Sequence, residues 1–365
     1  MGYVAVTGGK EAISASLEHL AYERVKDGKL IEVDALRSTM RGFIDQVMSE
    51  SSLYSEQLAA LAMKQSEGNI EEAVFLLRAH RSTLPRLYYS TVTNPREMFV
   101  QRRISASFKD IPGGQILGSS PDYLHRLLDF SLLEETQADI LNKKFEFETT
   151  EVPEESSLPL EKLPKVMDYL RSEGLIHDFP LNNTEPDDVT KENLTFPSSR
   201  SERLQILTRG QTGAINALGY AGLRGYGSSH PNVGEVRVGY QPIHVGLDSD
   251  EGDEAYYIGS IKLTEVESFI PMNVNVDGKE VLEFDIGYGA CFGQNETKAI
   301  AMSVLDHALE NPENTPIHDD EFVLLHVDTV ESTGFISHLK LPHYVTFQSK
   351  LEQVRKIKRG GGVNE

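Results

Sequence analysis

The period of the hydrophobic pattern changes along this chain, and that change constrains the fold more than any other feature. Over residues 10–80, apolar side chains recur at helical spacing in four segments with short connections, beginning with one that contains Leu17 and Leu20, which predicts a compact helical region. Asp34, Ser52 and Asn69 are typical N-cap residues for the second, third and fourth helices. The first part of the chain is therefore expected to be helical.

Beyond residue 200 the pattern mixes strand-like and helical segments. Strands are predicted over 235–246, 255–268, 281–286 and 322–326, and helices over 211–224 and 295–309. Because helices come first and mixed elements follow, we expect an α+β fold, with an N-terminal helical region followed by a mixed strand and helix C-terminal domain.

Changes in composition divide the chain into four expected parts. These are a mainly helical domain with a short strand pair (1–133), an acidic, proline-containing connection (134–200), a mixed α/β domain with a glycine-rich segment and a histidine loop (201–350), and a basic tail (351–365). The strand pair is placed at 102–108 and 115–118, followed by a helix from Pro121 to about Leu133. One amphipathic helix at about 161–173 interrupts the connection, whose remainder is either an ordered wrap or a solvated linker. Glycines at 360–362 predict a frayed end.

The charge balance limits the partners. The 365 residues include 35 Lys and Arg against 56 Asp and Glu, a formal net charge of −21. Binding of nucleic acid or of anionic lipid needs a basic surface, so neither partner is expected. The sequence shows no secretory signal and no run of about 18 apolar residues, so we expect no membrane span. A single cysteine, Cys291, excludes an internal disulfide and favours a reducing, cytoplasmic location.

The strongest local signal for chemistry is the segment 326–343, which holds His326, Asp328, Glu331, His338 and His343. The five-residue spacing of His338 and His343 differs from that of a helical zinc pair. Gly334 and Pro342 predict a bent loop that turns both imidazoles toward one point. Two imidazoles form a partial shell for Zn²⁺, with Asp328 or Glu331 orienting a ligand. The alternative is a surface loop with solvated histidines.

Glycine marks two further candidates. The segment from Arg209 to Gly239 contains eight glycines and Arg224, a composition that suits the binding of an anion. It lacks the Gly-Lys-Ser/Thr end of a Walker loop. Turns at helix ends explain most of its glycines. Gly287 to Glu296 joins a predicted strand to a predicted helix, where a phosphate or simply a tight turn fits. Cys291 within it is a nucleophile or, more commonly, an inert thiol.

A small basic group stands out in this acidic chain. It comprises Arg102, Arg103 and Lys109. These residues either bind a polyphosphate or form salt bridges with the acidic excess, and residue type favours the salt bridges.

Several long motifs resemble one known family. Residues 335–345, Phe-Ile-Ser-His-Leu-Lys-Leu-Pro-His-Tyr-Val, resemble the C-terminal signature of the I subunit of the bacterial carbon–phosphorus lyase core complex. The resemblance extends over essentially the whole chain and includes the segments 1–6, 68–86, 102–115, 224–231 and 290–296. It is weakest in the acidic segments 134–200 and 248–254 and in the basic tail.

The resemblance implies a specific reaction. The family acts with the G, H and L proteins to make α-D-ribose 1-methylphosphonate 5-triphosphate from ATP and methylphosphonate, with release of adenine. Alone, the subunit resembles a purine nucleosidase acting on ATP or GTP. Within the core complex it pairs with the J subunit, and self-association is expected as well. The family's two metal histidines, near that interface, correspond to His338 and His343, so zinc is the expected metal.

The residue types suit this chemistry. Displacement at the anomeric carbon passes through an oxocarbenium-like state that a carboxylate stabilises, while an acid protonates the leaving purine. Asp328 and Glu331 are the candidate catalytic carboxylates. The triphosphate, with or without Mg²⁺, needs local cations, for which the candidates are Arg102, Arg103, Arg224 and Lys340. Two alternatives stay open: a scaffold subunit that supplies metal ligands, and a stand-alone metal-dependent hydrolase.

Overall fold

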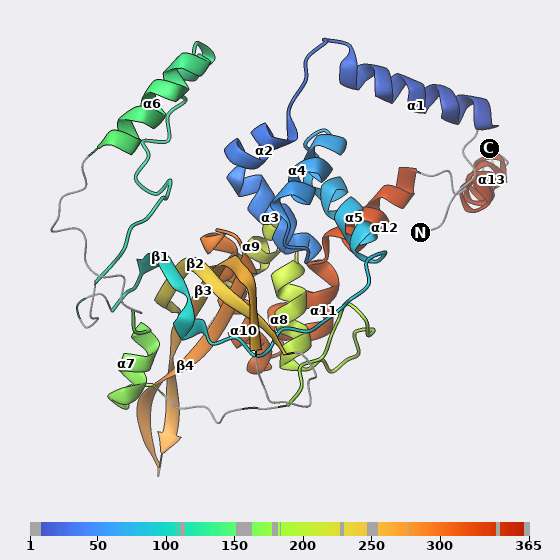
Figure 1. Ribbon diagram of the computed structural model, residues 1–365. Coiled ribbons are helices and arrows are strands. Elements are labelled where there is room, and N and C mark those ends of the chain that lie inside the picture. The colour runs from blue at the N-terminus through green and yellow to red at the C-terminus, as the bar shows by residue number, and fades with distance from the viewer. Residues whose placement is uncertain are drawn as a thin grey trace.

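The computed structural model describes residues 9–107, 109, 114–150, 163–176, 182, 184–226, 230–246, 255–276, 278–340 and 344–360. Within these ranges the fold is α+β, as predicted: a helical group stands beside an antiparallel sheet that further helices cover (Figure 1).

The helical group near the N-terminus is built on short helices with strong caps. It comprises α2 (Val33–Thr39), α3 (Arg41–Ser51), α4 (Glu56–Gln65) and α5 (Ile70–Arg81). Asn69 caps α5 as predicted, because its side chain accepts from the Glu72 N–H at 2.9 Å. The predicted cap at Ser52 is wrong: Ser52 closes α3 in a left-handed conformation, and Ser55 caps α4. The predicted second helix is divided at Met40 into α2 and α3, and Asp34 lies inside α2.

Alanines and methionines form the core of this group. Ala59, Ala60 and Ala73 are fully buried with Val47 and Met48, so the three helices α3, α4 and α5 approach closely. Burial of an amphipathic face, rather than helix propensity, holds such short helices. The group packs on the second half of the chain through contacts of α3 with α8 and β4 and of α5 with α12.

The sheet has the order β1-β2-β3-β4, with every neighbouring pair antiparallel. Its strands are β1 (Phe99–Ile104), β2 (Asn232–Gly246), β3 (Ala255–Val276) and β4 (Lys279–Phe292). The predictions for β2, β3 and β4 are confirmed, although β3 and β4 extend further than expected. The second member of the predicted strand pair is reduced to one bridge, between Arg103 and Ile116.

Helices α8 (Arg200–Arg209) and α10 (Glu296–Glu310) pack on the sheet, α10 most extensively, and α9 (Thr212–Ala221) packs against α10 (Figure 1). Two glycines of β4 let α10 lie close to the sheet. A Cβ added to Gly287 would overlap the carbonyl oxygen of Ser303 on α10, and a Cβ added to Gly289 would overlap the carbonyl oxygen of Ala299. The glycines of this strand therefore serve close packing.

The prediction of a strand over 322–326 is wrong. This segment is the helix α11 (Asp320–His326), which begins at Asp319, whose side chain accepts from the Phe322 N–H at 2.9 Å. Val323 and Leu324 are buried in the core that α8, α9 and α10 form. A short apolar run cannot by itself distinguish a strand from a buried helical turn.

The connection between the two halves is only partly as predicted. The amphipathic helix is confirmed as α7 (Val166–Ser172), which buries Val166, Met167 and Leu170 against the sheet. A further helix, α6 (Gln137–Thr149), was not predicted; Thr136 and Asp139 form a capping box at its start. The predicted helix from Pro121 to Leu133 is wrong, because this segment has only a short 3₁₀ turn, Phe130–Leu133.

Three segments project from the body of the molecule: α1 (Gly9–Val25), the arm 121–149 that carries α6, and α13 (Tyr344–Gly360) (Figure 1). Neither α1 nor α6 buries any residue. The side chains expected to face a core from α1, such as Leu17 and Leu20, are exposed. The described part of the basic tail is helical to Gly360, and the remaining glycines lie outside the described residues. Among the residues described, no helix combines the length and apolar composition needed to cross a bilayer.

Candidate functional site

The histidine segment is helical over most of its described length, so the predicted bent loop is wrong there. After α11 ends at His326, α12 (Thr329–Ser337) follows and passes into a 3₁₀ turn, His338–Lys340. His338 lies in that turn, and His343 lies outside the described residues. A helix of nine residues is about 13 Å long, so Asp328 at its start does not orient His338 at its end.

Asp328 anchors α12. Its side chain accepts from the N–H groups of Val330 and Glu331 at 3.0 and 2.9 Å, and it forms an ion pair with Arg78 at 2.6 Å. Burial favours the neutral carboxyl, but the Arg78 charge and the N–H donors outweigh it and hold the pKa of Asp328 below its usual value. Its two oxygens are thus engaged by the protein itself.

Arg78 and Glu50 join the helical group to the second half of the chain. Arg78 also donates to the carbonyl oxygens of Glu50 and Arg209, at 2.8 and 3.1 Å. The buried Glu50 carboxylate accepts from the Thr212 and Thr329 hydroxyls, both at 2.9 Å. The contacts between the helical group and the second half of the chain therefore fix the position of Asp328.

The four predicted cations come from three parts of the fold: Arg102 and Arg103 are neighbours on β1, and Arg224 and Lys340 lie in turns after α9 and α12. Arg102 is buried and bound by Asp122 and, at 2.7 Å, by Glu296 at the start of α10. Arg103 is buried and donates to the carbonyl oxygens of Gly114 and Pro164, at 2.7 and 3.1 Å. Arg102 therefore forms the salt bridges that one of the two interpretations expects, whereas Arg103 donates hydrogen bonds to backbone carbonyls.

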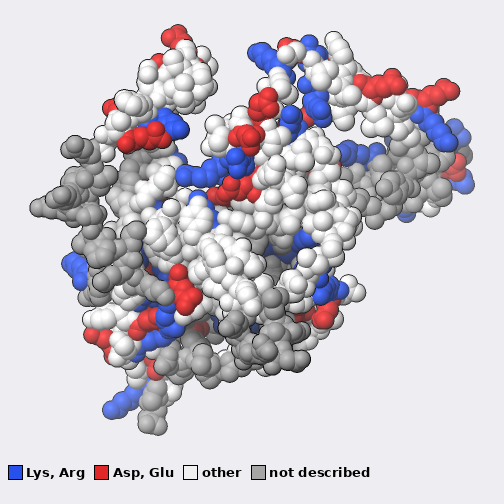
Figure 2. Space-filling view, in the orientation of Figure 1, with Lys and Arg blue, Asp and Glu red and all other residues white. Residues whose placement is uncertain are grey.

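Arg224 and Lys340 differ from the first two cations because they are exposed and, within the described ranges, form no ion pair. Arg224 lies in a π-helical turn, Gly222–Tyr226, directly after α9. Glu331, the second candidate carboxylate, is also exposed. Figure 2 shows that positive and negative side chains alternate on the face drawn there, without one continuous basic patch.

For the segment 287–296, the structure favours a tight turn between strand and helix over a phosphate site. Asn295 caps α10 by accepting from the Lys298 N–H at 3.2 Å. Cys291 is fully buried, and burial raises the pKa of its thiol to about 11. A thiol that stays protonated at neutral pH is a poor nucleophile, so the structure favours an inert cysteine here.

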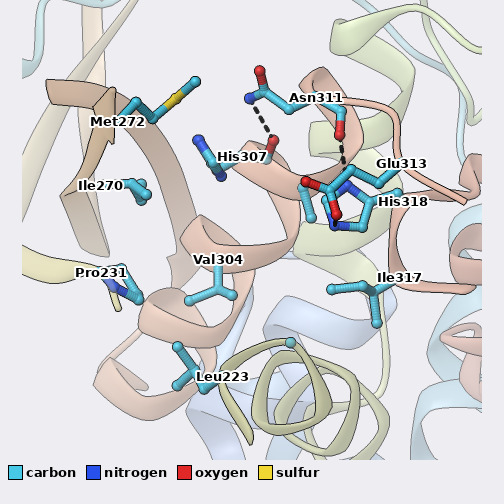
Figure 3. A pocket seen from close by; sticks show the side chains of 12 residues that line it. Leu223, Pro231, Ile270, Met272, Val304, His307, Asn311, Glu313, Ile317 and His318 are labelled. Carbon is cyan, nitrogen blue, oxygen red and sulfur yellow. Dashed lines mark hydrogen bonds and ion pairs between the residues drawn. The ribbon is translucent and has the colours of Figure 1, made fainter. Parts of the chain in front are cut away.

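A cavity of about 100 Å³ lies beside the π-helical turn. Its apolar walls come from the turn, the sheet, α10 and the segment after it (Figure 3): Leu223, Pro231, Ile270, Met272, Val304, Ala308 and Ile317. Polar side chains gather on one side: His307, Asn311, Glu313 and His318. No sequence motif marks these residues, because they belong to segments that only the fold brings together.

His307 is supported by a carboxylate from the sheet. Its Nε2 lies 3.1 Å from Oδ2 of Asp285 on β4, a hydrogen-bond distance with imperfect alignment. Asn311 donates to the same oxygen of Asp285 at 3.1 Å and to the His307 carbonyl at 3.0 Å. The hydrogen bond from His307 holds the pKa of Asp285 below its usual value, against the opposing effect of burial.

The second histidine of the cavity is fixed in a different way. Nδ1 of His318 donates to the Asn311 carbonyl at 2.6 Å, and its Nε2 lies 3.7 Å from a Glu313 oxygen. Figure 3 shows both contacts at the end of α10. Within the described part of the chain, no group of three or more His, Cys, Asp or Glu side chains is placed to hold a metal ion.

The fold is α+β, and its helical group is joined to the sheet half by hydrogen bonds and an ion pair. The cavity next to the Gly222–Tyr226 turn has apolar walls and polar side chains on one side. Such a cavity is suited to hold a small organic ligand. Residues 2–361 match the family model described as bacterial phosphonate metabolism protein (PhnI), and the chain belongs to this family.

Curated relatives match along nearly their full lengths. The chain is 43% identical over 366 aligned positions to the putative C-P lyase subunit protein HtxH of Stutzerimonas stutzeri, covering 97% of this chain and 95% of the relative. It is 42% identical to the α-D-ribose 1-methylphosphonate 5-triphosphate synthase subunit PhnI of Rhizobium meliloti, over 98% of this chain and 95% of the relative. The PhnI subunit of Escherichia coli is also 42% identical, with 98% of both chains covered.

Proposed function

We propose that this chain is the subunit of the carbon–phosphorus lyase system that displaces adenine from ATP with methylphosphonate. The product is α-D-ribose 1-methylphosphonate 5-triphosphate. The observation that carries the proposal is the end-to-end similarity, at 42% identity, to subunits named for that synthase. When alone, the chain acts as a purine nucleosidase on ATP or GTP, because water then takes the place of the phosphonate.

The reaction assigns roles to exposed side chains. Glu331, Arg224 and Lys340 are accessible to a ligand, and we propose Glu331 as a carboxylate near the developing positive charge and the two cations as triphosphate contacts, with Mg²⁺ as an additional counterion. Asp328, Arg102 and Arg103 are engaged by protein groups, so we give them positioning roles in the same reaction.

We propose zinc as the metal, held by His338 and His343. Nδ1 of His338 donates to the Phe335 carbonyl, which fixes the tautomer whose Nε2 carries the lone pair that a metal requires. Zinc bound there would supply a Lewis acid. The metal's remaining positions are open to water, substrate or a partner.

The proposed partners are the G, H and J subunits of the core complex, with the L protein in the synthase reaction and a second copy of this chain. The relatives are themselves named as subunits. Here the projecting segments α1 and α6 bury nothing and carry exposed apolar side chains, among them Leu17, Leu20, Phe145 and Phe147. The same observation favours a second candidate function, a scaffold subunit in which partners perform the displacement.

Reconstitution tests the proposed function. The purified G, H and L proteins are incubated with ATP and methylphosphonate, with and without this chain, and the products are followed by ³¹P NMR. We expect the ribose 1-methylphosphonate signal only when the chain is present. Equal product formation in its absence would overturn the proposal.

A further inference from the structure

The cavity beside the π-helical turn has the chemistry of a site for a flat heteroaromatic ring. Leu223, Ile270, Val304 and Ile317 provide apolar walls, and His307 and Asn311 lie on the polar side (Figure 3). A volume of about 100 Å³ is several times that needed for one water molecule. A purine has this character, with two apolar faces and a polar edge.

The Asp285–His307 pair has the arrangement of a supported acid–base group. The Asp285 carboxylate contacts Nε2 of His307, and this nitrogen is buried. The exposed 17% of the His307 side chain therefore belongs to its other atoms. A carboxylate at one ring nitrogen fixes the orientation of the imidazole and leaves the second nitrogen for chemistry. The lowered pKa of Asp285 keeps this carboxylate ionised at neutral pH.

The backbone builds this pair. Gly287 follows Asp285 by two residues on β4, and the absence of a side chain there lets α10 approach the strand at Ser303, one turn before His307. Asn311, at the C-cap of α10, then holds Asp285 from the other side. A carboxylate–imidazole contact at an interface of strand and helix has no counterpart in the predicted catalytic set.

From this geometry we propose that the cavity binds the purine base of the nucleotide and that His307, positioned by Asp285, is the acid that protonates the leaving purine. This inference rests on the proposed function and deepens it; Glu331 and Lys340 do not line the cavity, so it assigns neither of them a contact with the base. Arg224 follows Leu223 of the cavity wall in the same turn, and we assign it to the phosphates of that nucleotide.

The step balances as follows. The bond from C1′ of the ribose to N9 of adenine breaks, and its electron pair stays with the purine. The Nδ1–H of protonated His307 gives its proton to a ring nitrogen of the purine, and adenine leaves neutral. An oxygen of methylphosphonate, or of water in the nucleosidase reaction, bonds to C1′. His307 regains a proton from solvent or from the attacking hydroxyl.

The charged groups around His307 come from every neighbouring element. They are Asp285 on β4, Glu313 and His318 after α10, Asp306 on α10, and Arg200 on α8, which pairs with Asp306 at 2.7 Å. Any pH profile assigned to His307 therefore needs a comparison with His318→Gln.

The test uses the full chain, alone and with its partners, and two substrates. The rate of base release is measured with ATP and with N7-methyl-GTP, whose leaving group is already cationic and needs no acid. For His307→Gln we expect a loss of about 10²-fold or more with ATP and little loss with N7-methyl-GTP. His80→Gln, an exposed histidine on α5, is the matched control. Equal losses on both substrates, or none, would overturn the role of His307.

Two further measurements guard against a merely structural effect. Adenine binding is followed by calorimetry, and Leu223→Trp, which narrows the cavity but keeps His307, is expected to weaken adenine binding at least tenfold. Unchanged adenine binding in Leu223→Trp would overturn the cavity assignment.

Asp285→Asn should lower kcat with ATP and leave KM nearly unchanged. If the wild-type chain releases no base under either condition, the proposed function fails and protonation by His307 fails with it, while adenine binding still decides on the cavity.

Discussion

At the scale of single residues, Asp328 shows how a carboxylate can be conspicuous in the sequence and occupied in the fold. It caps α12 and pairs with Arg78 at 2.6 Å, in a part of the molecule where both side chains are nearly buried. Removal of one partner from a buried ion pair leaves the other charge uncompensated.

Asp328→Asn should lower the free energy of unfolding by about 3–5 kcal/mol. An Asn side chain can still cap α12, so the loss of stability measures the contribution of the Asp328 charge. Because the folded pKa of Asp328 is lowered, its contribution is fully present above the unfolded Asp pKa of about 3.9 and is lost as the pH falls through the lower folded value. Urea unfolding between pH 3 and 7 measures this. Asp34→Asn, at an exposed pair, is the control and should change little; equal effects of the two would refute the assignment.

Cys291 is predicted to react slowly in the native chain. Its thiol is fully buried with a pKa of about 11, so almost no thiolate is present at pH 7.5. Labelling with Ellman's reagent should be slow under native conditions and complete in urea. Rapid native labelling would contradict the inert role.

His338 and His343 together are expected to hold the zinc. The double variant His338→Ala with His343→Ala should lose bound zinc, measured by mass spectrometry of the metal content, in the chain alone and in the complex. His326→Ala, at the end of α11, is the control and should retain it. Unchanged zinc in the double variant would exclude this pair.

At the scale of elements, the contact between β4 and α10 decides the geometry of the cavity. Gly287→Ala places a Cβ against the Ser303 carbonyl, so α10 must shift away from the strand and Asp285 from His307. We expect a loss of about 3 kcal/mol in stability. Gly213→Ala, where a Cβ meets nothing within 4 Å, should be neutral or slightly stabilising. Thermal unfolding of the two variants compares them, and similar melting temperatures would contradict the packing argument.

Much of the element order could be predicted, because the short helices carry strong caps and the sheet strands alternate. Asn69, β2 and α10 were placed correctly on these grounds. Segment 322–326 was not, since its apolar residues face a helical core that the sequence does not display. The helix expected to pack through Leu17 and Leu20 forms but buries neither of them.

The candidate site was less accessible to sequence reasoning. Motif spacing indicated His338 and Asp328, which lie at opposite ends of α12. The Asp285–His307 pair is separated by 22 positions and has no motif, so only the pairing of β4 with α10 reveals it.

At the scale of the whole molecule, the chain resembles a component more than a finished enzyme. Its body carries the cavity beside His307, while α1, α6 and α13 extend from it (Figure 1). Exposed apolar side chains on such extensions mark surfaces for other proteins. We therefore propose a base-displacing site in the body together with partner contacts on the projections.

The most direct test of the central claim is whether the purified chain alone releases adenine from ATP. After incubation, adenine and ribose 5-triphosphate are separated by anion-exchange chromatography and quantified over time. The account predicts that both appear in equal amounts, at a rate that His307→Gln reduces and His80→Gln does not. If ATP stays intact with the chain alone and with its partners, base displacement does not occur in this protein, and the scaffold function is the better account.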